Sequence, residues 1–514
     1  MAVKLIMLLL FFSVMVGVGI YSRKHATSMN DFVLGGRSVG PWLTAFAYGT
    51  SYFSAVVFVG YAGQFGWKYG LASTWVGLGN AVLGSLLAWV VLGRRTRIMT
   101  HHLKAATMPD FFGKRYDSNA LRIAASAIVF IFLIPYTASL YNGLSRLFGM
   151  AFDVPYAVCV ILMATLTGVY VILGGYMATA INDFIQGIIM LAGIVAVILA
   201  VLNGQGGFMQ AVRSLSEIPS DVPVTLGQQG AFTSFFGPDP VNLMGVVILT
   251  SLGTWGLPQM VHKFYTIRIE IAFNTGTVIS TIFAVIISGG CYFLGGFGRL
   301  FDNPGIYAED GSIIYDGIIP SMLSTLPDVL IGIVVILVLS ASMSTLSSLV
   351  LTSSSTLTLD FIKGNLMKDL SDKKQLLITR ILIVFFIIIS VILALDPPTF
   401  IAQLMGISWG ALAGAFLAPF LYGLFWKRVT KAAVWASFAA GVGITVSNMF
   451  LHFIASPINA GAIAMVAGLV IVPVVSVLTP KPEKQHMDSI FACYDEPVSV
   501  KLKIALPEKE LDEE

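Results

Sequence analysis

The stretch SASMSTLSSLVLTSSSTLT, residues 340–358, places 12 serines and threonines among 19 residues, directly after the apolar run IGIVVILVL. In a helix one face would carry i, i+3, i+4, i+7 and i+11, namely Ala341, Ser344, Thr345, Ser348 and Thr352, with Ser347 at its border. Such oxygens, together with free carbonyls of a broken neighbouring helix, are ligands that a hard cation such as Na⁺ prefers. The alternative is that the hydroxyls bond to carbonyls of their own helix or pack against other helices. Residues 344–348 leave both interpretations open, and packing is favoured for residues 353–358.

One carboxylate also stands out. Asp183, in GGYMATAINDFIQG, is the only Asp, Glu, Lys, Arg or His between Val154 and Val212. Carboxylates inside a membrane are costly and often mark ion pathways. A carboxylate in the first turn of a helix, where it favours the helix dipole, is the equally weighted alternative.

Two apolar segments have the composition of broken helices that could supply carbonyls. Residues 41–64 place Gly49, Thr50, Ser51 and Ser54 near their middle, and residues 241–262 contain the run SLGTWGLP at 251–258. Glycine and proline weaken the helical ladder, and carbonyls released at membrane depth must face protein or a water-filled cavity. Close helix packing through small residues explains either segment alone, but not both at matched places.

The elements that position these residues are membrane-spanning helices. The chain has 514 residues, is 56% hydrophobic and 11% charged, and has a mean hydropathy of +0.85, which is typical of polytopic membrane proteins. A span needs roughly 20 apolar residues. The 13 candidates lie near residues 4–22, 41–64, 70–93, 119–149, 153–174, 182–203, 241–262, 272–298, 319–358, 377–396, 399–425, 432–454 and 460–479. The first of them is predicted to be a retained span and not a signal peptide.

The two candidate broken helices are spans two and seven, five spans apart. An odd separation inverts the second copy, so two five-helix repeats of opposite orientation are predicted, at about 41–203 and 241–425. The transmembrane domain is expected to cover residues 1–479, with a polar cytoplasmic tail at 480–514 that is predicted to be mobile. Two longer loops, 204–240 and about 299–318, fall on the opposite side, and a short amphipathic helix is expected near 207–217.

Basic residues give the orientation. With the N-terminus outside, 25 of the 30 lysines and arginines fall on the cytoplasmic side, among them Lys263, Arg268, Lys363 and Lys368. An N-terminus outside, a cytoplasmic C-terminus and an odd number of spans in the plasma membrane are therefore expected.

Other function classes lack support in the sequence. The net charge of +3 is uninformative, and the isolated cysteines Cys159, Cys291 and Cys493 form neither a disulfide framework nor a metal motif. No GxxxxGK[ST] motif is present, which argues against an ATP-driven pump. The six histidines show no metal spacing, so an enzyme is not expected; they are His25, His101, His102, His262, His452 and His486. A channel would need a continuous polar lining, and a sensor would need an added signalling domain.

Four segments together resemble the sodium:solute symporter family, closest to its bacterial proline and pantothenate branches, over about residues 10–480. They are DFVLGGRSVGPWLTAFAYGTSYFSA, LGGYMATAINDFIQG, GTWGLPQ and SASMSTLSS. The resemblance implies an all-α membrane protein of 13 spans with a five-plus-five inverted-repeat core. It also implies sodium-coupled uptake of a small organic solute by alternating access.

Matching the family's main sodium site implies five ligands: the carbonyls of Thr50, Phe53 and Ala341 and the hydroxyls of Ser344 and Thr345. Some members have a second sodium site nearer the cytoplasm. Its matching residues here are Asp183, Ser347 and Ser348, alongside Thr345, so one or two sodium ions per cycle are both open.

The residues expected to line the solute site differ from those of the family's proline and sugar transporters. Proline transporters have an aspartate at the position of Tyr52 and a tryptophan at Val56, and sugar transporters have a polar contact at Val57. The lining implied for this chain consists of Tyr52, Ser54, Val56, Val57, Tyr136, Tyr141, Asn142, Trp255 and Gln259. This largely apolar set disfavours a sugar. It favours proline or another amino acid, with pantothenate or a monocarboxylate as the alternative, since half-helix N-termini suit a carboxylate.

Overall fold

The computed structural model describes residues 2–152, 154–267, 272–367, 369–396 and 401–494. Within these ranges extended pairing is limited to two isolated bridges, Val39 with Ile267 and Tyr307 with Ile313, which confirms the all-α class. The α-helices are α1 (Ala2–Ser22), α2 (Met29–Leu34), α3 (Pro41–Tyr52), α4 (Ala62–Tyr69), α5 (Thr74–Gly79), α6 (Arg94–His102), α7 (Met108–Arg115), α8 (Asn119–Phe152), α9 (Tyr156–Gly204), α10 (Phe208–Glu217), α11 (Pro240–Gly256), α12 (Pro258–Thr266), α13 (Ala272–Ala284), α14 (Gly290–Gly295), α15 (Ile318–Ser324), α16 (Asp328–Thr356), α17 (Asp372–Leu395), α18 (Ile401–Phe425), α19 (Lys431–Leu451), α20 (Pro457–Leu478) and α21 (Lys484–Phe491). The π-helical segments are η3 (Val56–Tyr61), η5 (Asn80–Leu86), η6 (Trp89–Gly93), η9 (Val285–Gly289) and η13 (Leu357–Leu366).

The number of membrane-spanning helices in the structure is lower than the 13 spans expected from the sequence. The described residues contain 10 helices that are long and apolar enough to cross a membrane, or 11 if α11 and α12 form one span. Two of the 10, Val56–His102 and Tyr156–Gly204, cover parts of two expected spans each. Both contain a glycine in the left-handed region, Gly70 (φ +59°) and Gly175 (φ +54°). Thirteen spans and the two inverted repeats therefore stay predictions.

Both expected broken helices are confirmed. α3 ends at Tyr52, and the next residue, Phe53, is extended (φ −103°, ψ 100°). α11 ends at Gly256, Leu257 is extended (φ −83°, ψ 122°), and α12 starts at Pro258 with a bend of 45°. Proline suits the first turn of α12 because its missing N–H has no helical acceptor there.

The break in α9 depends on Gly175. Its backbone (φ +54°, ψ −146°) lies in a region that L-residues with a side chain rarely adopt. A Cβ at this position would also lie 2.7 Å from the carbonyl oxygen of Phe32. The glycine therefore lets α9 turn beside α2 and carry its second half, with Asp183, into the core.

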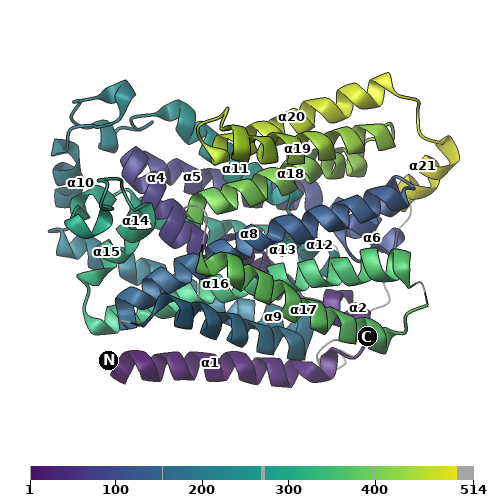
Figure 1. Cartoon of the computed structure of the whole chain (residues 1–514), viewed down its shortest axis with the longest axis horizontal. Helices are drawn as coiled ribbons and strands as arrows, with labels where there is room; N and C mark the ends of the chain where they lie inside the picture. Colours follow the sequence, from purple (N-terminus) through teal and green to yellow (C-terminus); the bar gives the residue numbers. More distant parts are fainter. Residues whose placement is uncertain (1, 153, 268–271, 368, 397–400, 495–514) are drawn as a thin grey trace, which may run out of the picture.

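The hydroxyl-rich helix α16 lies at the centre of the bundle. It packs against α9, α8 and α3, and every residue from Leu337 to Thr356 is buried. α18 packs against α8, α11, α19 and α20. α1 lies along one edge of the bundle and α20 along the opposite edge (Figure 1).

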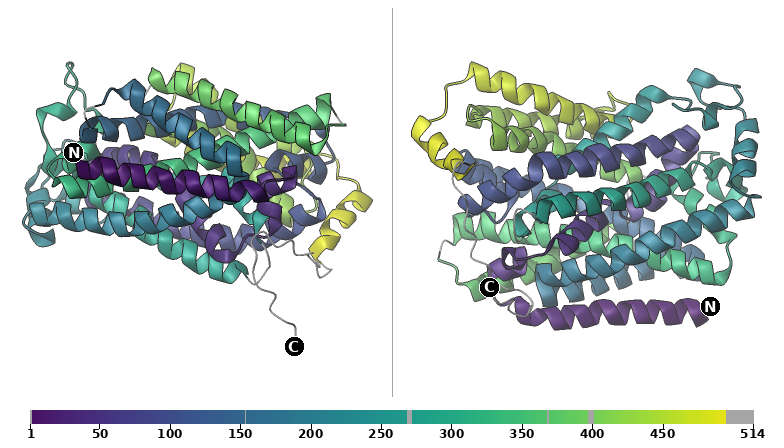
Figure 2. Two further views of the ribbon diagram at one scale, coloured as in Figure 1. Left: turned by 90° about the horizontal axis from the view of Figure 1, so that it is seen from below. Right: turned by 180° about the vertical axis from the view of Figure 1, so that it is seen from behind.

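The two ends of the bundle differ. The start of α1 lies at the same end as α10, α14 and α15, whereas α2, α6 and α21 lie at the other end (Figures 1 and 2). α10 confirms the amphipathic helix expected near 207–217.

The first part of the expected mobile tail is instead packed. Phe491 of α21 lies 5.0 Å from the guanidinium of Arg115, and Met487 and Ile490 are buried. The short amphipathic helix α21 places its apolar face against α6 and against Arg115 of α7, which the polar composition of the tail did not indicate. Residues 495–514, as well as Arg268 and Lys368, lie outside the described residues.

Candidate functional site

Four of the five oxygens predicted for the main sodium site converge between α3 and α16. The hydroxyl of Ser344 lies 2.9 Å from the carbonyl oxygen of Thr50 and 3.2 Å from that of Ala341. The hydroxyl of Thr345 lies 3.2 and 3.1 Å from the same two oxygens. Each hydroxyl has one hydrogen to donate, so the two hydroxyls serve the two carbonyls in alternative arrangements.

The break in α3 explains why the Thr50 carbonyl is available. In a continuous helix this oxygen would accept from the N–H of Ser54. The helix ends at Tyr52, and Phe53, which carries the fifth predicted oxygen, is extended. The site is thus a helix end facing two hydroxyls, all within the buried core.

The residues predicted for a second sodium ion are arranged around a lysine. The ammonium of Lys263 lies 3.5 Å from Oδ2 of Asp183 and donates to the hydroxyl of Ser348 at 3.0 Å. Ser347 instead donates to the Ser344 carbonyl of its own helix at 2.9 Å. The sequence places Lys263 among the loop residues of the cytoplasmic side, and this is wrong: its side chain is 2% exposed. It is buried because it follows the break at Leu257, which turns α12 back into the bundle.

The predicted solute lining is buried throughout, and part of it gathers around a residue that the sequence did not single out. The ring of Trp409, on α18, lies 6.1 Å from that of Tyr52 and 5.9 Å from that of Tyr136. It also covers Gly253 of α11, where a Cβ would lie 2.6 Å from the indole. Trp409 thus joins three helices, and no local pattern around it marks this position.

Other predicted lining residues face different neighbours. The indole N–H of Trp255 donates to the Leu83 carbonyl at 2.9 Å, so this side chain points toward η5. Tyr141 is fully buried in α8. The hydroxyl of Ser54 accepts from the N–H of Val56 at 3.2 Å, at the start of η3, which also carries Val57.

Several buried polar atoms of the lining have no hydrogen-bond partner among the described residues. They are the hydroxyls of Tyr136 and Tyr141, Oδ1 of Asn142, both amide atoms of Gln259 and Nε1 of Trp409. An unpaired polar group in the interior costs about 1–3 kcal/mol, so such groups concentrate where a ligand or water binds. Gln259 adds to this its position in the first turn of α12, at the positive end of the helix dipole.

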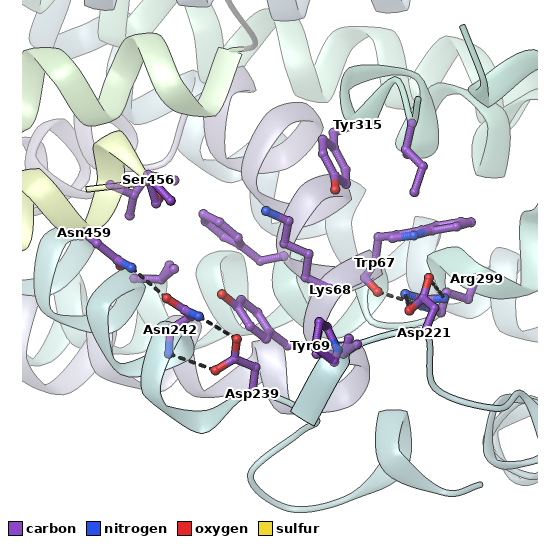
Figure 3. A pocket seen from close by; sticks show the side chains of 17 residues that line it. Trp67, Lys68, Tyr69, Asp221, Asp239, Asn242, Arg299, Tyr315, Ser456 and Asn459 are labelled. Atoms are coloured by element: carbon purple, nitrogen blue, oxygen red, sulfur yellow. Dashed lines mark hydrogen bonds and ion pairs between the residues drawn. The ribbon is translucent and has the colours of Figure 1, made fainter. Parts of the chain in front are cut away.

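A cavity of about 420 Å³ opens at the end of the bundle that carries α10 (Figure 3). Arg299 closes one side through a paired contact with Asp221, at 2.6 Å. Asp239 caps α11 by accepting from the N–H of Asn242 at 3.2 Å. Lys68 extends into the cavity, 5.1 Å from the Tyr315 ring, and forms no ion pair within the part of the chain that the structure describes.

This combination defines a class of protein. Helices broken inside an apolar bundle, an oxygen cluster at one break and unpaired polar groups beside both are features of a secondary transporter.

Comparison with known proteins gives the family. The sodium:solute symporter family model matches residues 32–441. The osmoregulated proline transporter OpuE of Bacillus subtilis (strain 168) is 28% identical over 94% of this chain and 96% of its own length. A sodium/proline symporter of Staphylococcus aureus (strain JH9) is 28% identical over 86% and 85%.

Solved structures show the same fold. A Na⁺-coupled sialic acid symporter, in a substrate-bound outward-open state, superimposes with a TM-score of 0.74 at 17% identity, covering 94% of this chain and 99% of that one. Mhp1, a nucleobase-cation-symport-1 family transporter in a closed conformation, gives a TM-score of 0.50 at 13% identity, with coverages of 90% and 98%. The chain belongs to the sodium:solute symporter family. It is a multi-pass membrane transporter that couples a small solute to sodium, and not an enzyme.

Proposed function

We propose that this protein takes up proline, or a closely similar small zwitterion or monocarboxylate, together with Na⁺ across the plasma membrane. The proteins named as proline transporters match nearly the whole chain, although at 28% identity. Pantothenate or another carboxylate is the alternative, because Tyr52 and Val56 replace the aspartate and tryptophan of the proline branch. The N-terminus lies outside and the C-terminus in the cytoplasm, as the basic residues favour.

The oxygen cluster between α3 and α16 is the observation that carries the proposal. A Na⁺ ion there would take the carbonyls of Thr50, Phe53 and Ala341 and the hydroxyls of Ser344 and Thr345 as ligands. Because Na⁺ binds oxygens from two helices at once, its presence favours the state in which α3 and α16 are close, and its release to the cytoplasm lets them separate.

The solute is expected beside the two breaks. Tyr52, Tyr136 and Trp409 would cover its apolar part, and Gln259 with the first turn of α12 would meet its carboxylate. The ammonium of Lys68 forms no ion pair among the described residues, although Asp221 and Asp239 line the same cavity, and it would attract an anionic group of the solute.

One sodium ion is sufficient for strong accumulation. Moving one charge across 100 mV supplies about 2.3 kcal/mol, and a tenfold sodium gradient adds about 1.4 kcal/mol. Together they support a gradient of several hundredfold for a zwitterionic solute such as proline. A monocarboxylate anion carried with one Na⁺ moves no net charge, so the sodium gradient alone would drive it.

A thermal-shift experiment on the purified protein tests the proposal. We expect Na⁺ to raise the unfolding temperature, K⁺ at equal ionic strength to leave it unchanged, and proline to raise it further only when Na⁺ is present. Pantothenate, a monocarboxylate and a sugar would be measured in parallel to identify the solute class. Stabilisation by a solute that is equal with Na⁺ and K⁺ would contradict sodium coupling.

A further inference from the structure

We propose that the ammonium of Lys263 is a built-in cation that fills the position of a second sodium ion, so that the protein binds one Na⁺ per chain. This inference rests on the proposed function, because it takes the α3–α16 oxygen cluster as the one exchangeable sodium site.

The ammonium lies among the side chains that the family resemblance assigns to a second ion. It is 3.5 Å from Oδ2 of Asp183 and 3.0 Å from the hydroxyl of Ser348. The side chains of Lys263 and Asp183 are 2% and 0% exposed, so water solvates neither group. The aromatic face of Tyr176 lies 5.2 Å from the ammonium on another side, a distance at which a cation and a ring attract each other.

These contacts connect four helices. Asp183 comes from α9 beyond its break at Gly175, Lys263 from α12 beyond the break at Leu257, and Ser348 from α16. The hydroxyl of Ser348 lies 2.8 Å from that of Ser51 in α3, which is one residue from the Thr50 carbonyl of the main site. The lysine is therefore held by the same helices that hold the main site.

A mobile cation would have to share this position with the ammonium, although neither carboxylate oxygen of Asp183 has a hydrogen-bond partner among the described residues. Of the four residues implied for the second site, Asp183 and Ser348 contact the ammonium, Ser347 donates within its own helix, and Thr345 faces the main site. Asp183 is the one carboxylate in contact with Lys263 within the described ranges. The pair is neutral as it stands, and an added Na⁺ would leave an uncompensated positive charge in the interior.

The proposal has a consequence for coupling. A transporter with two exchangeable sodium ions carries two charges with each zwitterionic solute, whereas this protein would carry one. The ammonium supplies the attraction between α9, α12 and α16 that a second ion would supply, but it cannot leave. The second half of the broken seventh helix is thus tied to α9 and α16 whether or not sodium is bound.

Counting bound sodium tests the proposal without any solute. Radioactive ²²Na⁺ binding to the purified protein, at saturation and normalised to chain concentration, should give one ion for the natural sequence. Lys263→Met keeps a side chain of similar length without the charge, and it should give two ions, the added one lost again in Lys263→Met with Asp183→Asn. Lys427→Met, which removes an exposed lysine at the surface, serves as the matched control and should give one.

The outcomes separate the two proposals. Two ions bound by the natural sequence would overturn the inference and leave sodium coupling intact, whereas none would overturn the proposed coupling ion and the inference with it. One ion bound by a folded Lys263→Met, verified by its elution profile and thermal unfolding, would also overturn the inference. If Lys263→Met does not fold, the number of sodium ions bound by the natural sequence still decides whether the inference holds.

Discussion

Removing the hydroxyl of Ser344 is predicted to weaken sodium binding far more than it weakens the fold. In Ser344→Ala the main site keeps the carbonyls of Thr50 and Ala341, because both also lie within 3.2 Å of the Thr345 hydroxyl. The loss is therefore one of five oxygens around the ion. When sodium is absent, the one hydrogen of the Thr345 hydroxyl can serve the Thr50 carbonyl, and the Ala341 carbonyl lies within the continuous helix α16.

The magnitude follows from this arrangement. A polar contact to a charged group contributes about 1.5–3 kcal/mol, against about 1 kcal/mol for a neutral hydrogen bond. Since 1.4 kcal/mol corresponds to a factor of ten, the sodium dissociation constant should rise by roughly 10- to 150-fold. Unfolding free energy should fall by about 1 kcal/mol. Thr345→Ala should behave similarly, because its hydroxyl contacts the same two oxygens.

The assay is ²²Na⁺ binding over a range of sodium concentrations, followed by solute binding at saturating sodium. Ser342→Ala is the matched control: it lies in the same buried helix, but its hydroxyl donates to the Val338 carbonyl of that helix at 2.7 Å. It should leave sodium affinity within about twofold, as expected for a side chain outside the site.

A change of less than about threefold in Ser344→Ala and Thr345→Ala would refute the assignment of both hydroxyls as sodium ligands, since each would then contribute less than a neutral hydrogen bond. Equal losses in these variants and in Ser342→Ala would attribute the effect to packing of α16 and not to the ion.

Three further predictions concern other parts of the molecule. Gly175→Ala should lower the stability by at least about 2 kcal/mol in thermal unfolding, since its φ is +54° and a Cβ would press on the Phe32 carbonyl. Gly204→Ala, with open space around it, should have a small effect. Trp409→Phe keeps a six-membered aromatic ring but removes the five-membered ring of the indole with its N–H, so solute affinity at saturating sodium should fall by at least about fivefold, about 1 kcal/mol, with sodium affinity unchanged. Burial raises the pKa of Asp316, in the loop before α15, to about 6. The folded chain therefore retains a proton that the unfolded chain loses near pH 4, and stability should fall by up to about 3 kcal/mol as pH rises from 4 to 6. Asp316→Asn should reduce this slope in unfolding measurements, and an unchanged slope would assign it to other groups.

The two broken helices and the shared face of the α16 hydroxyls follow closely from the sequence. The Gly and Pro residues near 251–258 predict the break at Leu257, and the helical spacing of Ser344 and Thr345 predicts that both hydroxyls share a face. In span two the sequence predicts a break but not its position. The helix ends at Tyr52, three residues after Gly49, because the end point depends on how α3 packs and not on local propensity.

Contacts between distant segments could not be predicted in the same way. Lys263 follows an apolar run, as a lysine at a membrane surface does, and only the fold brings it to Asp183, 80 positions earlier in the chain. Trp409 lies in an apolar helix where any large residue would satisfy the pattern. Its role depends on the crossing of α3, α8 and α11, which spacing within α18 does not encode.

The central claim, that a sodium gradient drives solute into the cell, is tested most directly by uptake of labelled proline into proteoliposomes. With sodium outside and potassium inside, we expect accumulation above the equilibrium level, increased by an inside-negative potential and lost when the sodium gradient is removed. If proline proves not to be the solute, the compound selected by the thermal-shift panel replaces it. Uptake that ignores the sodium gradient, or that follows an imposed proton gradient instead, would contradict the account.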